Sequence, residues 1–161
     1  MRWALAEPTA VARTLSIGVR LSLVGDPGEL FADARALESA GAHSLWVEAA
    51  DADPYVALAA LAAVTWRVAL VASGAASGTG RETCERISRG RLRVADELAR
   101  SGERWIRADF PADAAAWRAT RDAATASGAV GIVLPNDPRL LDLLRNPDQV
   151  IDRADLNLAT G

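Results

Sequence analysis

The chain has 161 residues, half of them hydrophobic, and a formal net charge of −3. This length and hydrophobic content suffice for a folded domain with a buried core, and they exclude an intrinsically disordered chain. The mildly negative charge argues against a general binder of nucleic acids or anionic membranes. All 18 basic residues are arginine, so no lysine is present for a Schiff base or a phosphate-binding loop.

Cysteine content and apolar segments indicate the compartment. Cys84 is the single cysteine, which excludes an intrachain disulfide and a cysteine zinc cluster. The longest apolar run, residues 56–64, is too short to span a bilayer. The N-terminus soon meets Glu7 and Pro8, unlike a secretion signal. We therefore expect a cytoplasmic protein whose residues 1–161 form a single α/β domain, with residues 1–14 as an N-terminal arm or short helix.

Strand and helix signals alternate along the chain. After a strand at 16–24, the sequence Asp26-Pro27-Gly28-Glu29 predicts a capped helix start, and Gly41 predicts the end of that helix. Similar patterns predict further strands at 44–48, 67–72, 92–94, 105–110, 130–134 and near 156–158, and further helices at 53–64, 79–88, 111–127 and 137–145.

This alternation implies right-handed crossovers and a parallel sheet. A closed barrel of eight strand–helix units needs about 200 or more residues. With six or seven expected strands, the fold is a small barrel, an incomplete barrel, or not a barrel.

Three pieces of the first 94 residues carry a family resemblance. The first runs from Ile17-Gly18-Val19 to the segment AGAHSLWVE at 40–48, the second is DPYVALAALAAVT at 53–65, and the third is SRGRL at 88–92. In order and spacing they resemble the luciferase-like monooxygenase family. The resemblance implies a shortened or incomplete TIM-type (β/α) barrel with parallel strands, an oxidoreductase activity, and FMN or a deazaflavin as cofactor.

The sequence also departs from that family. Glu48-Ala49-Ala50 stands where the family usually has Asp-His or a related polar pair, and the long insertions after the third and fourth strands are absent. Glu48, at the end of a predicted strand, is a candidate general base or cofactor contact. No catalytic residue can be assigned beyond this candidate.

Two further segments are candidate cofactor contacts. Ser73 and Gly74 lie where family members often have a non-proline cis peptide that supports the flavin ring, although an ordinary glycine-containing loop is the preferred interpretation. The glycine-rich stretch 74–81 ends in Arg81 before a helix and could hold an anion. It is neither a Walker A motif nor a dinucleotide fingerprint, and a flexible linker is the preferred alternative.

Other reactive side chains have structural interpretations. His43 precedes a strand and would lie on the face of a barrel opposite the active site. Cys84 is expected to be a small buried side chain. The cluster Arg86, Arg89, Arg91 and Arg93 is expected on a solvated surface, with phosphate or carboxylate binding as the alternative. With one histidine, neither a Ser-His-Asp hydrolase nor a histidine-rich metal site can form.

Two functional hypotheses follow. The first is a small luciferase-like oxidoreductase or flavin/deazaflavin-binding protein of unknown substrate. The second is a non-catalytic relative that serves as an oligomeric scaffold or partner-binding protein. The helix from Asp53 to Val64 is apolar on all sides, and family members commonly dimerise through this region. We therefore expect a symmetric homodimer in which these helices pack against each other across the two-fold axis, and in which replacing Leu58 and Leu61 by Glu yields monomer or aggregate.

Overall fold

The computed structural model describes residues 14–48, 53–74 and 80–147. In this part of the chain, six parallel strands form one sheet in the order β4-β3-β2-β1-β6-β5. The strands are β1 (Ser16–Leu21), β2 (Ser44–Glu48), β3 (Ala69–Ser73), β4 (Leu92–Val94), β5 (Trp105–Arg107) and β6 (Gly131–Pro135). The helices are α1 (Pro27–Ala40), α2 (Pro54–Val64), α3 (Arg81–Ser88), α4 (Ala95–Arg100), α5 (Ala114–Ala126) and α6 (Leu140–Arg145).

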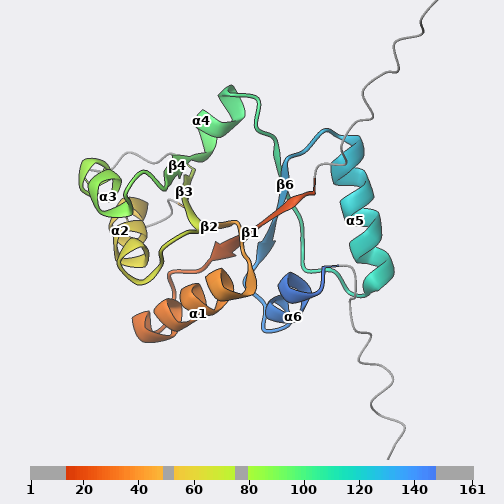
Figure 1. Ribbon diagram of the computed structural model, residues 1–161, viewed down its shortest axis with the longest axis horizontal. Coiled ribbons are helices and arrows are strands. Elements are labelled where there is room, and N and C mark those ends of the chain that lie inside the picture. The colour runs from red at the N-terminus through yellow and green to blue at the C-terminus, as the bar shows by residue number, and fades with distance from the viewer. Residues whose placement is uncertain (1–13, 49–52, 75–79, 148–161) are drawn as a thin grey trace, which may run out of the picture.

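The sheet is a barrel that is open on one side. Strand β1 pairs with both β2 and β6, so the chain returns to its first strand as it does in a closed barrel, whereas β4 and β5 are the two edges. Helices α3, α2, α1, α6 and α5 follow one another around the outside, and α4 lies at the open side (Figure 1). The expected shortened TIM-type barrel with parallel strands is therefore confirmed as a curled half-barrel.

The convex face of the sheet carries the main core. Apolar side chains from the four central strands are at most 4% exposed there: Val19, Leu21, Leu45, Val47, Leu70, Ala72, Ile132 and Leu134. They pack in one cluster with buried side chains of α1, α2, α3, α5 and α6. Because each Å² of apolar surface removed from water stabilises the fold by about 25 cal/mol, this cluster is the dominant favourable contribution to folding.

The concave face carries two tryptophans that lie over glycines. Trp46 of β2 and Trp105 of β5 have ring centroids 5.4 Å apart. A Cβ atom on Gly18 would lie 2.6 Å from Trp46 Nε1, and one on Gly131 would lie 2.6 Å from Trp105 Cε3. Trp46 Nε1 donates to Ser44 Oγ at 2.8 Å. The absence of side chains on the two neighbouring strands therefore makes room for both indoles.

Helix α4 covers part of this face and was not expected from the sequence. Its Ala95 and Leu98 pack against a small cluster that contains Trp46, Val71 and Val133. The helix has six residues and no side-chain cap. Its acidic first turn and the basic Arg100 in its last turn are helix signals, but six residues without a side-chain cap make too short a segment to stand out.

Helix α2 is apolar on all sides, as expected, but its own chain covers its largest side chains. Tyr55, Leu58 and Leu61 are at most 1% exposed, packed in the convex cluster beside α1 and α3. Leu58 and Leu61 are therefore covered by their own chain and are not available to a partner, whereas the dimer itself stays a prediction. The helix instead exposes Val56, at 63%, and is followed by Trp66, which is 70% exposed.

Glu38 of α1 holds the turn between α2 and β3. Its carboxylate accepts hydrogen bonds from the backbone N–H groups of Trp66, Arg67 and Val68, at 2.8, 2.6 and 2.9 Å. Burial raises the pKa of this carboxyl, but the three N–H groups and the Arg67 charge outweigh that effect, so the pKa lies below its ordinary value.

Arg91 holds the other side of the same turn. Its guanidinium donates to the carbonyl oxygens of Ala62, Thr65 and Val68 at 3.0, 3.1 and 3.2 Å, and to Thr65 Oγ1 at 3.0 Å. These carbonyls include unpaired ones at the end of α2, which a cation satisfies well. The expectation of a solvated Arg91 is therefore wrong, because its length lets it reach the neighbouring helix end.

Element boundaries differ from the sequence pattern in several places. Asp26 and Asp53 cap α1 and α2 as expected. Helix α5 starts three residues later than predicted and is capped by Asp113, whose side chain accepts from the Ala116 N–H. Helix α6 starts at Leu140, after the Asp-Pro pair rather than at it. The predicted first residue of α3, at position 79, the arm at 1–14 apart from residue 14, and the strand near 156–158 lie outside the described residues.

Replacing Gly131 by Ala is expected to lower the free energy of unfolding by about 2 kcal/mol or more. The new Cβ would overlap the Trp105 ring and lie 2.7 Å from the backbone oxygen of Ser16, which has little freedom to move. Gly18→Ala should cost less, because its near neighbours are side-chain atoms of Trp46 and Ser44. Urea denaturation measures both variants; equal stability of Gly131→Ala and the native chain would contradict this packing.

Replacing Glu38 by Gln is expected to cost about 1 to 3 kcal/mol at neutral pH, since charged acceptors form the stronger hydrogen bonds. The folded-state pKa of Glu38 is lowered, so its contribution is present above the ordinary pKa and lost as pH falls through the folded-state value. Urea denaturation should therefore give curves for native and Glu38→Gln that converge below about pH 4. Glu29→Gln, an exposed site on the same helix, is the control; a constant difference down to pH 3 would contradict the argument.

Candidate functional site

Four polar side chains lie at the carboxyl ends of the strands. Arg20 is near the end of β1, and Glu48, Ser73 and Arg107 are the last residues of β2, β3 and β5. They alternate with convex-face residues, which places all four on the concave side of the sheet. In α/β barrels and open α/β sheets, this edge is where ligands bind.

Arg107 connects Glu48 and Ser73. Its Nη1 donates to Glu48 Oε1 in an ion pair, and its Nη2 donates to Ser73 Oγ at 3.2 Å. In the sheet order, β5 and β3 are four strand positions apart, which is about 19 Å along a flat sheet. The contact between Arg107 and Ser73 exists because the sheet curls.

The Glu48–Arg107 ion pair is open to solvent. The two side chains are 40% and 49% exposed, respectively, so water screens their attraction, and such pairs contribute at most about 1 kcal/mol. Ser73 is 1% exposed, and its hydroxyl also donates to the Val47 carbonyl at 3.4 Å. The pair therefore fixes side-chain positions at this edge more than it stabilises the fold.

Arg20 has an unpaired guanidinium beside this group. Within the described residues it makes no side-chain hydrogen bond or ion pair. It borders two cavities at the carboxyl edge. One, of about 350 Å³, is lined by Arg20, Leu21, Ser22, Glu48, Pro135 and Asn136. The other, of about 180 Å³, is lined by Arg20, Arg107, Ala108, Asp109 and Val133.

The peptide between Ser73 and Gly74 is trans, and the described residues contain no cis peptide. Gly74 has φ = 85°, a left-handed conformation that glycine adopts without strain. The cis peptide that the family resemblance suggested is therefore not formed at this bond, and residues 75–79 of the loop lie outside the described residues. Ser73 belongs to the site through its hydroxyl instead.

Arg81 is held away from the other candidates. Its guanidinium donates to Glu85 on α3 and to Glu97 on α4, both at 2.9 Å. These two hydrogen bonds raise the pKa of the Arg81 guanidinium, and the bond to Glu85 has the larger effect. Arg81 therefore ties α3 to α4 and does not join Glu48 and Ser73 in this structure.

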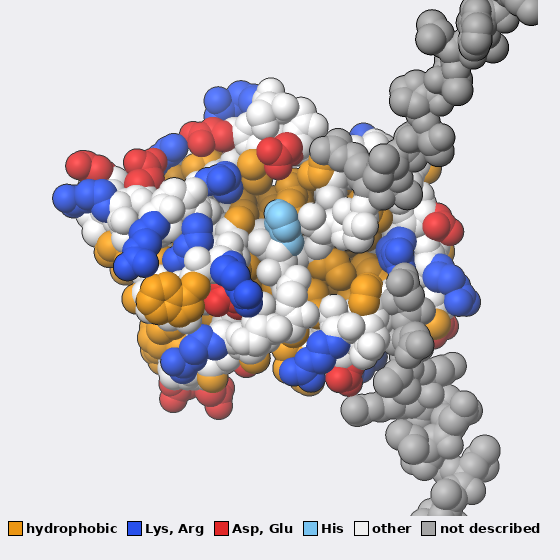
Figure 2. Space-filling model, viewed as in Figure 1, with side chains coloured by type: hydrophobic (Ala, Val, Ile, Leu, Met, Phe, Trp, Pro, Cys, Tyr) orange, Lys and Arg blue, Asp and Glu red, His pale blue; other side chains and the backbone are white. Residues whose placement is uncertain are grey.

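The remaining reactive side chains have the expected structural character. His43 is exposed at the start of β2, with its ring 5.8 Å from that of Trp105. Figure 2 shows this histidine in pale blue beside hydrophobic side chains that reach the surface. Cys84 is fully buried, and burial raises the pKa of its thiol to about 11, which keeps it unreactive. Arg86, Arg89 and Arg93 are exposed.

A larger cavity lies beneath α4, at the open side of the half-barrel. Its volume is about 460 Å³. Its walls are Trp46, Trp105 and Val133 on the sheet and two alanines on α4, and its polar lining comes from Glu103, Arg104 and Arg107. Arg107 thus stands between this cavity and the carboxyl-edge site.

The sequence interpretation missed Arg20, Arg107 and Asp109 as site residues. The signal was present for the two arginines: each stands near the carboxyl end of a predicted strand, at a position that alternates with buried residues. The strand containing Arg107 was predicted to continue to residue 110, which hid its position as the last strand residue.

In the described ranges, no three His, Cys, Asp or Glu side chains converge on a point where a metal could bind. None of the helices in these ranges combines the length and hydrophobicity needed to cross a membrane.

No known family model matches this sequence, and no curated protein matches it either. The resemblance to luciferase-like monooxygenases therefore rests on the three motifs between residues 17 and 94 alone.

Proposed function

We propose that the chain binds FMN or a deazaflavin through the phosphate of the cofactor at the carboxyl edge of its half-barrel. The observation that carries this proposal is the guanidinium of Arg20, which has no partner among the described residues and borders both carboxyl-edge cavities. Arginine binds phosphate with two parallel N–H donors, and a guanidinium without a partner is available for such a contact. The motif resemblance supplies the identity of the cofactor.

The charges around the site decide how strongly an anion can bind. Arg20 and Arg107 are opposed by Glu48 and Asp109, so the four side chains sum to zero. Glu48 is already paired with Arg107, which leaves Asp109 as the carboxylate that competes with a phosphate for Arg20. Binding should therefore be weak and sensitive to salt.

Each residue of the site has a distinct task in this proposal. Arg20 holds the phosphate, Arg107 provides further donors, and the buried Ser73 hydroxyl helps to position Arg107 by accepting from its Nη2. Glu48 fixes the orientation of Arg107 and can accept a hydrogen bond from a ligand with its second oxygen. The bound cofactor would supply electron or hydride transfer, whereas the protein binds it, orients it and limits the access of water.

Titration with FMN tests this proposal. Addition of native protein to FMN should quench cofactor fluorescence at protein concentrations near 100 μM, an affinity expected for one weak phosphate contact and a partly open site. Arg20→Gln should weaken binding about tenfold, because a hydrogen bond to a charged group is lost. Riboflavin, which lacks the phosphate, should bind more weakly and be insensitive to this substitution.

Arg35→Gln, at an exposed position on α1, is the matched control and should bind FMN as the native chain does. Inorganic phosphate should compete with FMN. A deazaflavin carrying a phosphate should show the same dependence on Arg20. An unchanged fluorescence signal at these concentrations would reject the cofactor proposal in favour of the scaffold hypothesis.

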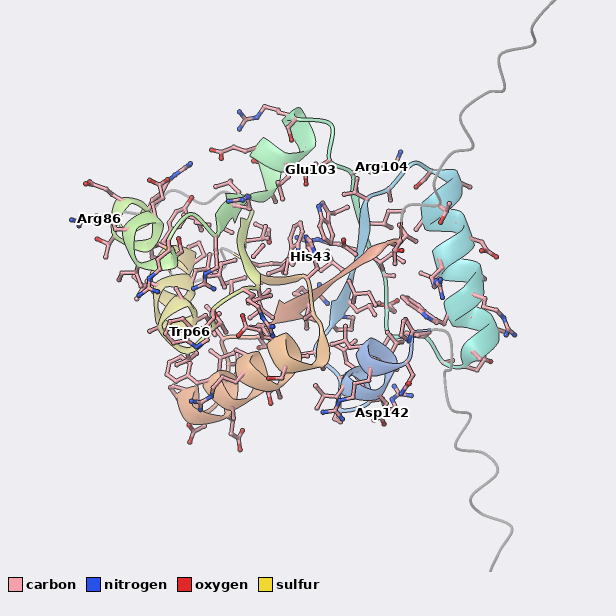
Figure 3. The ribbon with its side chains drawn as sticks, in the orientation of Figure 1. His43, Trp66, Arg86, Glu103, Arg104 and Asp142 are labelled. Atoms are coloured by element: carbon pink, nitrogen blue, oxygen red, sulfur yellow. The ribbon has the colours of Figure 1, made fainter. Side chains whose placement is uncertain are left out.

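The second candidate function is an oligomeric scaffold, favoured by hydrophobic side chains exposed on α2, on α3 and in the turn after α2. Val56, Trp66 and Ile87 are 63%, 70% and 44% exposed. Figure 3 labels Trp66 at the outer surface beside α2, and Figure 2 shows hydrophobic atoms there. The guanidinium of Arg89 lies over the Trp66 ring, with its central carbon 5.6 Å from the ring centroid. A symmetric homodimer would cover these side chains with the same face of a second copy.

Replacing Trp66 and Ile87 together by Glu is expected to convert a native dimer into a folded monomer. Both side chains are exposed, so charges are tolerated in the monomer but not at an apolar interface. Sedimentation at micromolar concentration measures the change, and circular dichroism checks the fold. Val24→Glu is the control, since Val24 is 92% exposed but lies after β1. A native chain that sediments as a monomer would rule out the dimer.

A further inference from the structure

The cavity beneath α4 has walls suited to a flat apolar ligand. The indoles of Trp46 and Trp105 lie against the sheet over glycines, so they line the cavity instead of filling it. Opposite them, Ala95 and Ala99 are four residues apart on one face of α4 and are too small to close the space. The volume of about 460 Å³ lies within the range of small-molecule sites.

One buried donor in the wall lacks a partner. Trp105 Nε1 is shielded from water and has no hydrogen-bond partner in the described part of the chain. A buried N–H left unpaired costs about 1 to 3 kcal/mol, and native structures contain few of them. This N–H group is shielded from the cavity as well as from bulk water, so it is not counted as a contact for a ligand. Trp46 needs no such partner, because its Nε1 already donates to Ser44.

The polar rim offers one guanidinium to an anion. Glu103 and Arg104 are consecutive residues between α4 and β5, and both line the cavity (Figure 3). Within the described residues, the guanidinium of Arg104 makes one long hydrogen bond, 3.5 Å to the Ser127 carbonyl, which leaves most of its donors available to a ligand. Arg107 at the inner end is paired with Glu48, so Arg104 is the cation that can face an anion.

We propose that this cavity binds a small planar aromatic anion, such as a bicyclic aromatic carboxylate. The ring lies between the indole wall and the two alanines of α4. The carboxylate faces Arg104. This site adjoins the carboxyl-edge site of the proposed function, because Arg107 borders both, but it does not use Arg20 and does not depend on the proposed function.

Titration of the full chain with 2-naphthoate tests the proposal by NMR. The indole N–H resonances of Trp46 and Trp105, assigned by single replacements with Phe, should shift with a dissociation constant of about 0.1 to 1 mM. Neutral 2-naphthol should bind about threefold more weakly, as expected for one solvent-screened charge pair. Arg104→Gln should remove this preference without changing binding of 2-naphthol.

Filling the cavity provides the decisive variant. Ala99→Leu should weaken 2-naphthoate binding at least about tenfold by occupying the space of the ring, and Ala95→Leu on the same face should act likewise. Ala119→Leu, at an exposed position on α5, is the matched control and should bind as the native chain does. Indole resonances that do not move at millimolar 2-naphthoate, or unchanged binding by both cavity-filling variants, would overturn the proposal.

The proposals for the two sites can be rejected independently of each other. Arg20→Gln should leave 2-naphthoate binding unchanged, and Ala99→Leu should leave FMN binding unchanged. Loss of 2-naphthoate binding in Arg20→Gln would overturn the inference of a separate aromatic site. A chain that binds 2-naphthoate but not FMN supports this inference while rejecting the proposed function.

Discussion

The concave face of this sheet must be covered without the two strands that complete an eight-stranded barrel, and two indole rings over two glycines meet that constraint. Trp46 lies over Gly18 and Trp105 over Gly131, and a Cβ atom at either glycine would overlap the ring above it. The two rings cover the centre of the concave face where the glycines leave it without side chains. They also set the distance at which α4 can pack, because its Leu98 contacts the same cluster.

The curl of the sheet creates the candidate site. Arg107 lies on one edge strand and Ser73 on the strand next to the other edge, yet their side chains are 3.2 Å apart. A flatter sheet would separate them by several strand spacings. The same curl leaves the side between β4 and β5 open, where a six-residue helix with no fully buried side chain covers a ligand-sized cavity. Incomplete closure of the barrel thus provides two kinds of site: a polar one at the carboxyl edge and an aromatic one under α4.

The surroundings of each charged side chain decide whether it is bound within the fold or can contact a ligand. Glu38 and Arg91 hydrogen-bond backbone groups of the turn between α2 and β3, and these groups would otherwise lack partners. Arg81 forms ion pairs with Glu85 and Glu97. Arg20 has no such partner in the described residues, although it looks no different in the sequence. The contrast explains why the glycine-rich stretch that ends in Arg81 pointed to that arginine, whereas the geometry points to Arg20.

The sequence by itself determined the parallel strand–helix order, the caps at Asp26 and Asp53, the glycine stop at Gly41 and the buried, unreactive character of Cys84. These features depend on residues within one or two turns of each other, or on apolar character alone, so a local pattern is sufficient. The tertiary structure decided which residues meet. Arg107 is 59 residues from Glu48 and 34 from Ser73 in the chain, and the cover over Leu58 and Leu61 comes from other helices. Such contacts depend on the curl of the sheet and on the space left by Gly18 and Gly131, which no local pattern encodes.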